Sequence, residues 1–305
     1  NVYSFHVFAL RIIISFTCIV YMSCCSVNLK LTLLISADIR KSGVHNLGTP
    51  CIQFSLIALL VLNVQSIILM YSIISQIGKE VIDDKMIRSV VTAILHSGRA
   101  LSRTNKWTVP LMYQWHDKHY LGAAHGIAGI MFMLLQVKEH LTLEELTELI
   151  QPTVDYLCNL QFPSGNMPSS TSNPSDKLVH WCHGAPGSLF LFAKAYQIFG
   201  DTSYLEYAKK CGECIWERGL LKKGYGLCHG SAGNGYAMLY LYQVTGDAVY
   251  LYRAAQFGNW CQDYGTHGCH TPDRPLSLFE GLAGNIHFLV DLMNPDEAKF
   301  PAFVL

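Results

Sequence analysis

The sequence predicts an all-α fold, an α/α toroid of helical hairpins with Gly-x-x-Gly turns at its central end. Two observations support this prediction. A Gly-x-x-Gly turn occurs four times, beginning at Gly126, Gly184, Gly230 and Gly281, which are 58, 46 and 51 residues apart. Apolar and amphipathic stretches also alternate along residues 79–305. Such a repeat indicates an inner layer of helices that is covered by an outer layer.

Each turn leads into a strongly apolar stretch, and these stretches predict inner helices at 130–136, 188–199, 234–244 and 285–293. Stretches with one apolar face predict outer helices at 84–102, 143–160, 202–220 and 248–264. The period-2 alternation that marks a β-strand does not extend over a useful length in the sequence.

The residue before each turn is titratable in all four repeats: His125, His183, His229 and Glu280. A helix start offers unpaired N–H groups and the positive end of the helix dipole, and glycine there lets neighbouring chains approach closely. One such motif alone is best interpreted as a packing turn with a polar cap. Four titratable residues at one register favour a functional centre where the inner helices begin.

Composition excludes some classes of protein. A formal net charge of zero, from 22 basic and 22 acidic side chains, argues against a nucleic-acid partner. The 11 cysteines are an odd number without the spacing of a disulfide framework. We therefore expect a cytoplasmic protein with reduced thiols. Cys211 and Cys214 have the spacing of a redox motif, but inside a predicted outer helix we interpret them as structural.

Residues 1–78 form a separate apolar segment with only five charged side chains. Its stretch 51–77 has no charge and is long enough to span a bilayer. Its stretch 7–27 contains Arg11 and lacks the cleavage site of a signal peptide. The alternatives are membrane association, including peripheral association with the plasma membrane, burial as core helices, and an aberrant N-terminus. The start at Asn1 instead of methionine favours the last of these.

Two of the turns contain the same tripeptide, Cys182-His183-Gly184 and Cys228-His229-Gly230. Thiolate and imidazole together are preferred ligands of Zn²⁺. Their separation is not that of a zinc finger, but a ring of hairpins could bring the two turns to one centre. Four ligands would give a closed structural site, and three would leave one position open for catalysis. The residue types alone do not decide between these, and packing remains the alternative.

Six motifs in residues 79–305 resemble those of the eukaryotic lanthionine synthetase C-like family. They are YQWH (113–116), GAAHGIAG (122–129), SGNMPSS (164–170), HWCHGAPG (180–187), KGYGLCHGSAGNGY (223–236) and PDRPLSLFEGLAG (272–284). The resemblance implies an α/α toroid with a zinc ion and bound glutathione. By position, the zinc ligands would be Cys182, Cys228 and His229, with His183 outside the coordination sphere.

The resemblance also implies an activity. Members of this family are thought to add glutathione to dehydroalanine or dehydrobutyrine residues of proteins or peptides. The resulting enolate needs a proton, and His125 matches the position of a general acid. The alternative is a catalytically silent protein that binds zinc and glutathione as a signalling or membrane-linked scaffold. A toroid glycosidase is disfavoured, because it needs two carboxylates and only Glu280 occupies a turn position.

Glutathione carries two carboxylates, and the resemblance places its binding at Lys223 and at the loop His270-Thr271-Pro272-Asp273. Asp273 could accept a hydrogen bond from the ammonium group of the ligand. His270 stands where the family usually has arginine, and it cannot form the bidentate fork of a guanidinium. We therefore expect weaker glutathione binding than in relatives.

The resemblance further implies a ring of seven hairpins, of which four are recognisable here. We expect an N-terminally truncated or atypical member of the family with an incomplete ring. An open ring would expose apolar surface of the inner helices and predicts poor solubility or a protein partner.

Overall fold

The structure is a computed structural model that describes residues 84–305, all of which lie in the second of two compact units of the chain, Leu60–Leu305. The apolar segment 1–78 lies outside the described residues, and so does its predicted boundary at residue 79. The predictions for that segment stay predictions.

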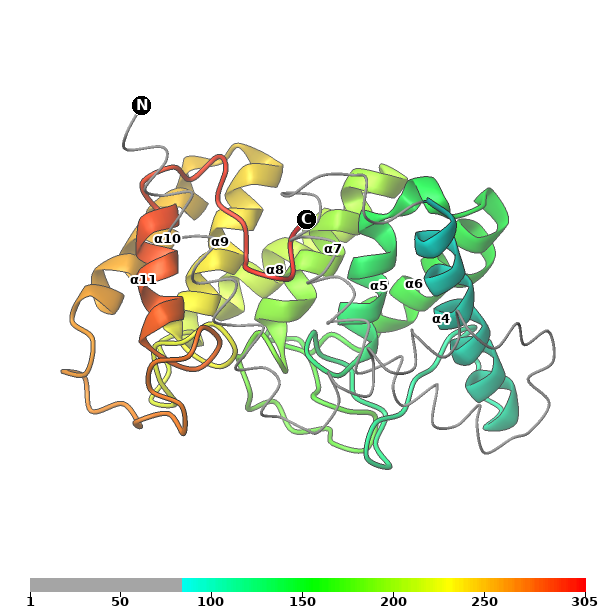
Figure 1. The fold of residues 1–305 in the computed structure, drawn as a ribbon, viewed down its shortest axis with the longest axis horizontal. Coiled ribbons are helices and arrows are strands. Elements are labelled where there is room, and N and C mark those ends of the chain that lie inside the picture. Colours follow the sequence, from blue (N-terminus) through cyan, green and yellow to red (C-terminus); the bar gives the residue numbers. More distant parts are fainter. Residues whose placement is uncertain (1–83) are drawn as a thin grey trace, which may run out of the picture. The chain divides into compact units, whose positions relative to one another are not determined.

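The described residues fold into alternating inner and outer helices, as predicted (Figure 1). The inner helices are α5 (Ile127–Gln136), α7 (Ala185–Phe199), α9 (Ser231–Thr245) and α11 (Leu282–Asp291). The outer helices are α4 (Asp84–Thr104), α6 (Gln151–Cys158), α8 (Thr202–Arg218) and α10 (Ala248–Gln262). The short helix η2 spans Lys138–His140, and the π-helix η3 (Glu145–Ile150) runs directly into α6. Residues 84–305 contain isolated β-bridges but no strand.

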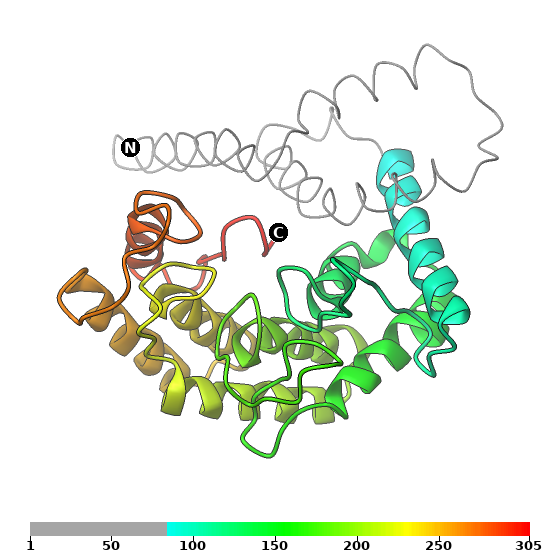
Figure 2. The same ribbon diagram turned by 90° about the horizontal axis from the view of Figure 1, so that it is seen from below.

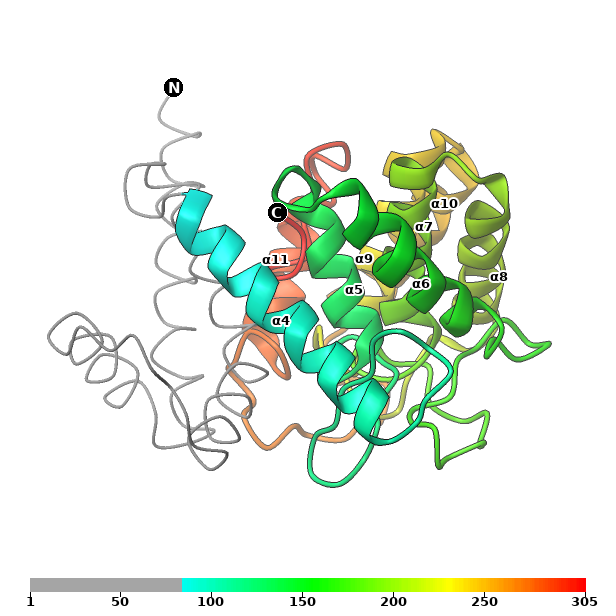
Figure 3. The same ribbon diagram turned by 90° about the vertical axis from the view of Figure 1, so that its right-hand side faces the viewer.

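The inner helices pack side by side in chain order, so that α5 contacts α7, α7 contacts α9 and α9 contacts α11. Helices α6, α8 and α10 each contact two successive inner helices. Figures 2 and 3 show α8 and α10 on one side of α7 and α9. This arrangement explains the two hydropathy patterns. Every residue from Ser231 to Leu241 of α9 is buried, whereas an outer helix buries one face only.

The outer and inner helices begin differently. Asp201 and Asp247 cap α8 and α10, because their carboxylates accept the backbone N–H groups of Ser203 and Val249 at 2.8 and 2.9 Å. The inner helices instead begin at a glycine N-cap with no side-chain hydrogen bond. The starts of the inner helices are therefore not closed by their own caps.

The Gly-x-x-Gly motif overlaps the helix that it introduces. Its first glycine is the N-cap, and its second is the third residue of the helix. Each inner helix consequently begins three residues before the apolar stretch that predicted it. A Cβ atom on the second glycine would overlap a carbonyl oxygen six residues earlier in every repeat, at Ala123, Trp181, Leu227 and Leu278. The second glycine is thus a packing requirement.

We expect Gly233→Ala to lower the free energy of unfolding by about 3 kcal/mol or more, at the upper end of overpacking effects. The reason is the overlap of the new methyl group with the backbone of Leu227. Gly246→Ala is the control, because nothing lies within 4 Å of a Cβ there and only its φ of +69° is unfavourable. It should cost roughly 1–2 kcal/mol. Urea denaturation measures both values, and equal losses would contradict the packing explanation.

Residues 294–305 cross the inner helices. Phe300 and Phe303 are buried and pack against Phe190 of α7. Gln136 of α5 and Gln243 of α9 hydrogen-bond to the backbone of the same segment. Figure 2 shows this segment, in red, on the side of the inner helices away from α8. Within the described residues, the segment covers part of the inner apolar surface that was expected to be exposed.

Candidate functional site

The four turns lie side by side and are joined by their backbones. The N–H of Cys182 donates to the carbonyl of Cys228 (3.1 Å), and the N–H of Cys228 donates to the carbonyl of Phe279 (2.7 Å). The first turn meets the second at Gly122, where an added Cβ atom would overlap the carbonyl oxygen of Cys182. Figure 1 shows the loops that precede the inner helices gathered at one end. Residues of four distant turns therefore share one centre.

Three side chains of this centre form a candidate metal site. The sulfur atoms of Cys182 and Cys228 and a ring nitrogen of His229 all lie within 4.8 Å of one another. No other group of this kind occurs in residues 84–305. Zn–S bonds of ~2.3 Å and Zn–N bonds of ~2.0–2.1 Å require ligand atoms at about 4 Å from one another. The donor set and its spacing therefore fit zinc with small adjustments.

The electrostatics of the two cysteines also suit a metal site. The pKa of Cys182 is well below its usual value, chiefly because the Cys228 thiol hydrogen-bonds to its sulfur, with further contributions from His180 and His229. The pKa of Cys228 is raised, first by the same hydrogen bond and then by burial. The hydrogen bond therefore favours a thiolate at Cys182 and a thiol at Cys228, and a bound cation would favour the loss of the second proton.

The two Cys-His-Gly turns differ in their backbones, and only one of their histidines joins the cluster. The N-cap Gly184 has a φ of +124°, a conformation that favours glycine, whereas Gly230 is extended with a φ of −137°. The ring of His183 packs instead near Tyr120 (5.4 Å between centroids). Its Nδ1 atom is buried, without a hydrogen-bond partner among the described residues. His183 thus lies outside the group of three possible ligands.

His125 lies close enough to Cys182 and His183 for both to affect its pKa. Its ring is stacked with that of Trp115 at 6.2 Å and lies 6.5 Å from that of His183. The His125 side chain is partly open to solvent. Its pKa is lowered, mainly because the surrounding protein displaces water from the ring and then because His183 is close. The imidazole is therefore neutral at pH 7.4 and can accept a proton.

The predicted glutathione residues come from two loops that the structure brings together. The N–H of His270 donates to the carbonyl of Lys222 (2.8 Å), next to Lys223. The side chains of Lys223, His270, Thr271 and Asp273 are exposed, and Pro272 is half-buried. These residues are accessible to a ligand, and the contact between the two loops is made by the backbone.

Sequence reasoning missed the residues that hold the second loop. The ring of His267 is stacked on Trp260 at 3.5 Å, and its backbone N–H donates to the Tyr225 hydroxyl (3.1 Å). Tyr225 belongs to the turn that carries Cys228. The only signal in the sequence was the aromatic content of this region, which does not specify partners.

Other features lie apart from the centre. Cys211 and Cys214 are buried in α8 as free thiols with raised pKa values, that of Cys214 reaching about 11 because of burial.

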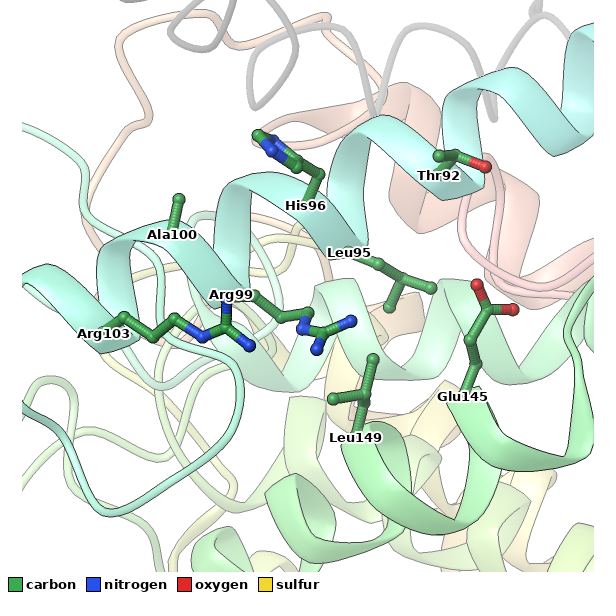
Figure 4. Close-up of a pocket in the computed structure, with 8 residues that line it drawn as sticks. All are labelled: Thr92, Leu95, His96, Arg99, Ala100, Arg103, Glu145 and Leu149. Carbon is green, nitrogen blue, oxygen red and sulfur yellow. The ribbon is translucent and has the colours of Figure 1, made fainter.

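A cavity of about 320 Å³ lies between α4 and η3 (Figure 4). It is lined by Thr92, Leu95, His96, Arg99, Ala100, Arg103, Glu145 and Leu149. None of the predicted site residues lines this cavity. Within residues 84–305, no helix is both long and apolar enough to cross a membrane.

The fold and the centre define an all-helical toroid protein with a Cys-Cys-His cluster where its inner helices begin. Residues 64–305 match the model of the lanthionine synthetase C-like protein family. The chain therefore belongs to the lanthionine synthetase C-like family, as its motifs predicted.

Known proteins that resemble the chain include a relative in sequence and a solved structure. The chain is 50% identical over 239 residues to a Danio rerio protein named glutathione S-transferase LANCL1. The matched region covers 77% of this chain and 59% of that protein. The chain thus spans about three fifths of the length of this relative. The solved structure of nisin cyclase superposes with a TM-score of 0.56 at 15% identity, over 69% of this chain and 58% of that one. This second likeness confirms the toroid fold.

Proposed function

We propose that this protein binds zinc and glutathione and adds the glutathione thiol to dehydroalanine or dehydrobutyrine residues of proteins or peptides. The observation that carries the proposal is the convergence of Cys182, Cys228 and His229, with His125 at 6.5 Å from the ring of His183, the neighbour of Cys182 in the sequence. Family membership and a relative named as a glutathione S-transferase support the choice of thiol.

Cys182, Cys228 and His229 would hold the zinc ion and leave a fourth position for the incoming thiol. When bound there, zinc supplies a charge that keeps a glutathione sulfur deprotonated at neutral pH. Three protein ligands are the usual number in catalytic zinc sites.

The proton follows a path that the chain itself provides. The neutral imidazole of His125 accepts the proton that the glutathione thiol loses. A sulfur–carbon bond forms at the β-carbon of the dehydroamino acid, and the π electrons move to the enolate. The imidazolium of His125 then returns the proton to the α-carbon, which completes the addition without another reactant.

The proposed addition of glutathione can be assayed directly. Zinc-loaded protein is incubated with glutathione and a dehydroalanine peptide, and mass spectrometry follows the addition of one glutathione. We expect the adduct to form faster than with zinc-depleted protein or without protein. If the protein binds zinc and glutathione but forms no adduct, the proposed enzymatic activity is wrong and the alternative of a catalytically silent scaffold is favoured.

The second loop gives a separate prediction on affinity. Arginine is always charged and presents two parallel donors to a carboxylate, whereas histidine does not. His270→Arg should therefore tighten the binding of S-methylglutathione at pH 7.4 by about tenfold or more, the effect of a charged hydrogen bond. Calorimetric titration measures this, and the methylated ligand avoids any effect of the thiol. Unchanged affinity would remove position 270 from the ligand site.

A further inference from the structure

Four aromatic side chains from distant parts of the chain form a cluster, and two of them belong to residues bonded through the backbone to the two cysteines. Trp181 is stacked on Phe300 (4.9 Å between centroids, 20° between planes). It also meets Phe303 edge-on at 5.0 Å and Phe279 at 5.8 Å. We name Trp181, Phe279, Phe300 and Phe303 the aromatic cluster.

We propose that the aromatic cluster positions Cys182 and Cys228 for metal binding, so that segment 294–305 acts on the centre without contacting the metal. The inference rests on the proposed zinc site. Trp181 is covalently joined to Cys182, and the carbonyl of Phe279 accepts the N–H of Cys228. Cys182 is therefore linked to the aromatic cluster by a peptide bond, and Cys228 is linked to it by a backbone hydrogen bond.

The aromatic cluster is rigid because it is buried and tied to the inner helices. Trp181, Phe300 and Phe303 are each no more than 3% exposed. The backbone of Phe303 accepts a hydrogen bond from Gln136 of α5 (2.9 Å), and its ring packs on Phe132 at 4.5 Å. Buried rings with fixed neighbours transmit displacement to the atoms they support.

Trp181 contributes its ring and not its polar group. Its Nε1 atom is buried without a hydrogen-bond partner among residues 84–305, which is unfavourable for folding. The indole ring nonetheless meets three phenylalanine rings. Packing next to Cys182 is the role that this position fits, and phenylalanine should satisfy it.

Phe300→Ala tests the inference, with Phe257→Ala as the matched control. Both phenylalanines are no more than 2% exposed, but Phe257 lies on the outer helix α10. Zinc affinity is measured by competition with a chelator, and the cobalt-substituted protein reports ligand geometry by its absorption spectrum. Loss of a supporting residue typically weakens metal binding about 10–100-fold.

We expect Phe300→Ala to weaken zinc binding by about tenfold or more and to change the cobalt spectrum. Phe257→Ala should lower the melting temperature by a similar amount and leave both metal readouts unchanged. If Phe300→Ala does not fold, Phe303→Leu and Trp181→Leu replace it, and Trp181→Phe should restore wild-type affinity.

The outcomes separate the two proposals. Equal zinc affinity and an unchanged spectrum in Phe300→Ala and the wild type would overturn the positioning role alone. Equal weakening in Phe257→Ala would also overturn it, because a general loss of stability would then explain the effect. A wild-type protein that binds no zinc would overturn the zinc site and, with it, this inference.

Discussion

Cys228→Ala is expected to abolish stoichiometric zinc binding, from one Zn²⁺ per chain in the wild type to almost none. The variant removes one of only three ligand atoms in the cluster. It also removes the hydrogen bond that holds the pKa of Cys182 low. The remaining thiol would be protonated more easily, and protonated thiols do not bind metal. Elemental analysis of the purified protein measures the ratio.

Cys261→Ala is the matched control for this experiment. Cys261 is also a free cysteine of the described part of the chain, but it is buried in α10 and belongs to no ligand group. It should retain the full zinc content. Full zinc in Cys228→Ala would exclude the proposed ligand set.

His125→Ala should keep its zinc and slow the addition of glutathione to a dehydroalanine peptide by ~10²-fold or more, the usual scale for a lost acid–base group. Mass spectrometry gives the rate, and elemental analysis of the same sample gives the zinc content. The control is His96→Ala, because His96 is an exposed histidine on α4. An unchanged rate in His125→Ala would remove this residue from the reaction.

The pH dependence follows from the same residue. The pKa of His125 lies below its ordinary value of 6.5, mainly because the surrounding protein displaces water from the ring and then because His183 is close. Its neutral form, which accepts the thiol proton, is therefore retained as the pH falls from 7.4 to 6.5 and is lost at lower pH. We expect the advantage of the wild type over His125→Ala to persist across that window and to shrink below it, at constant measured zinc content.

The sequence predicted the helices well because their causes are local. Apolar stretches mark the inner helices, and each helix begins three residues earlier than predicted and ends within two residues of its predicted end. The first three residues were missed because glycine at the third helical position is unfavourable for a helix in isolation. The close approach of a carbonyl group from six residues earlier explains why the position requires glycine. This contact cannot be recognised from helix propensity.

The sequence by itself determined the fold class, the family and the residue types available at the centre. Tertiary structure decided which of these residues meet. Cys182-His183 and Cys228-His229 are identical dipeptides, yet only His229 lies in the cluster, because the backbone differs at Gly184 and Gly230. The contact between Phe300 and Trp181 could not be predicted from the sequence either, because more than a hundred residues separate them. Local patterns specify helices, whereas contacts between distant turns depend on how those helices pack.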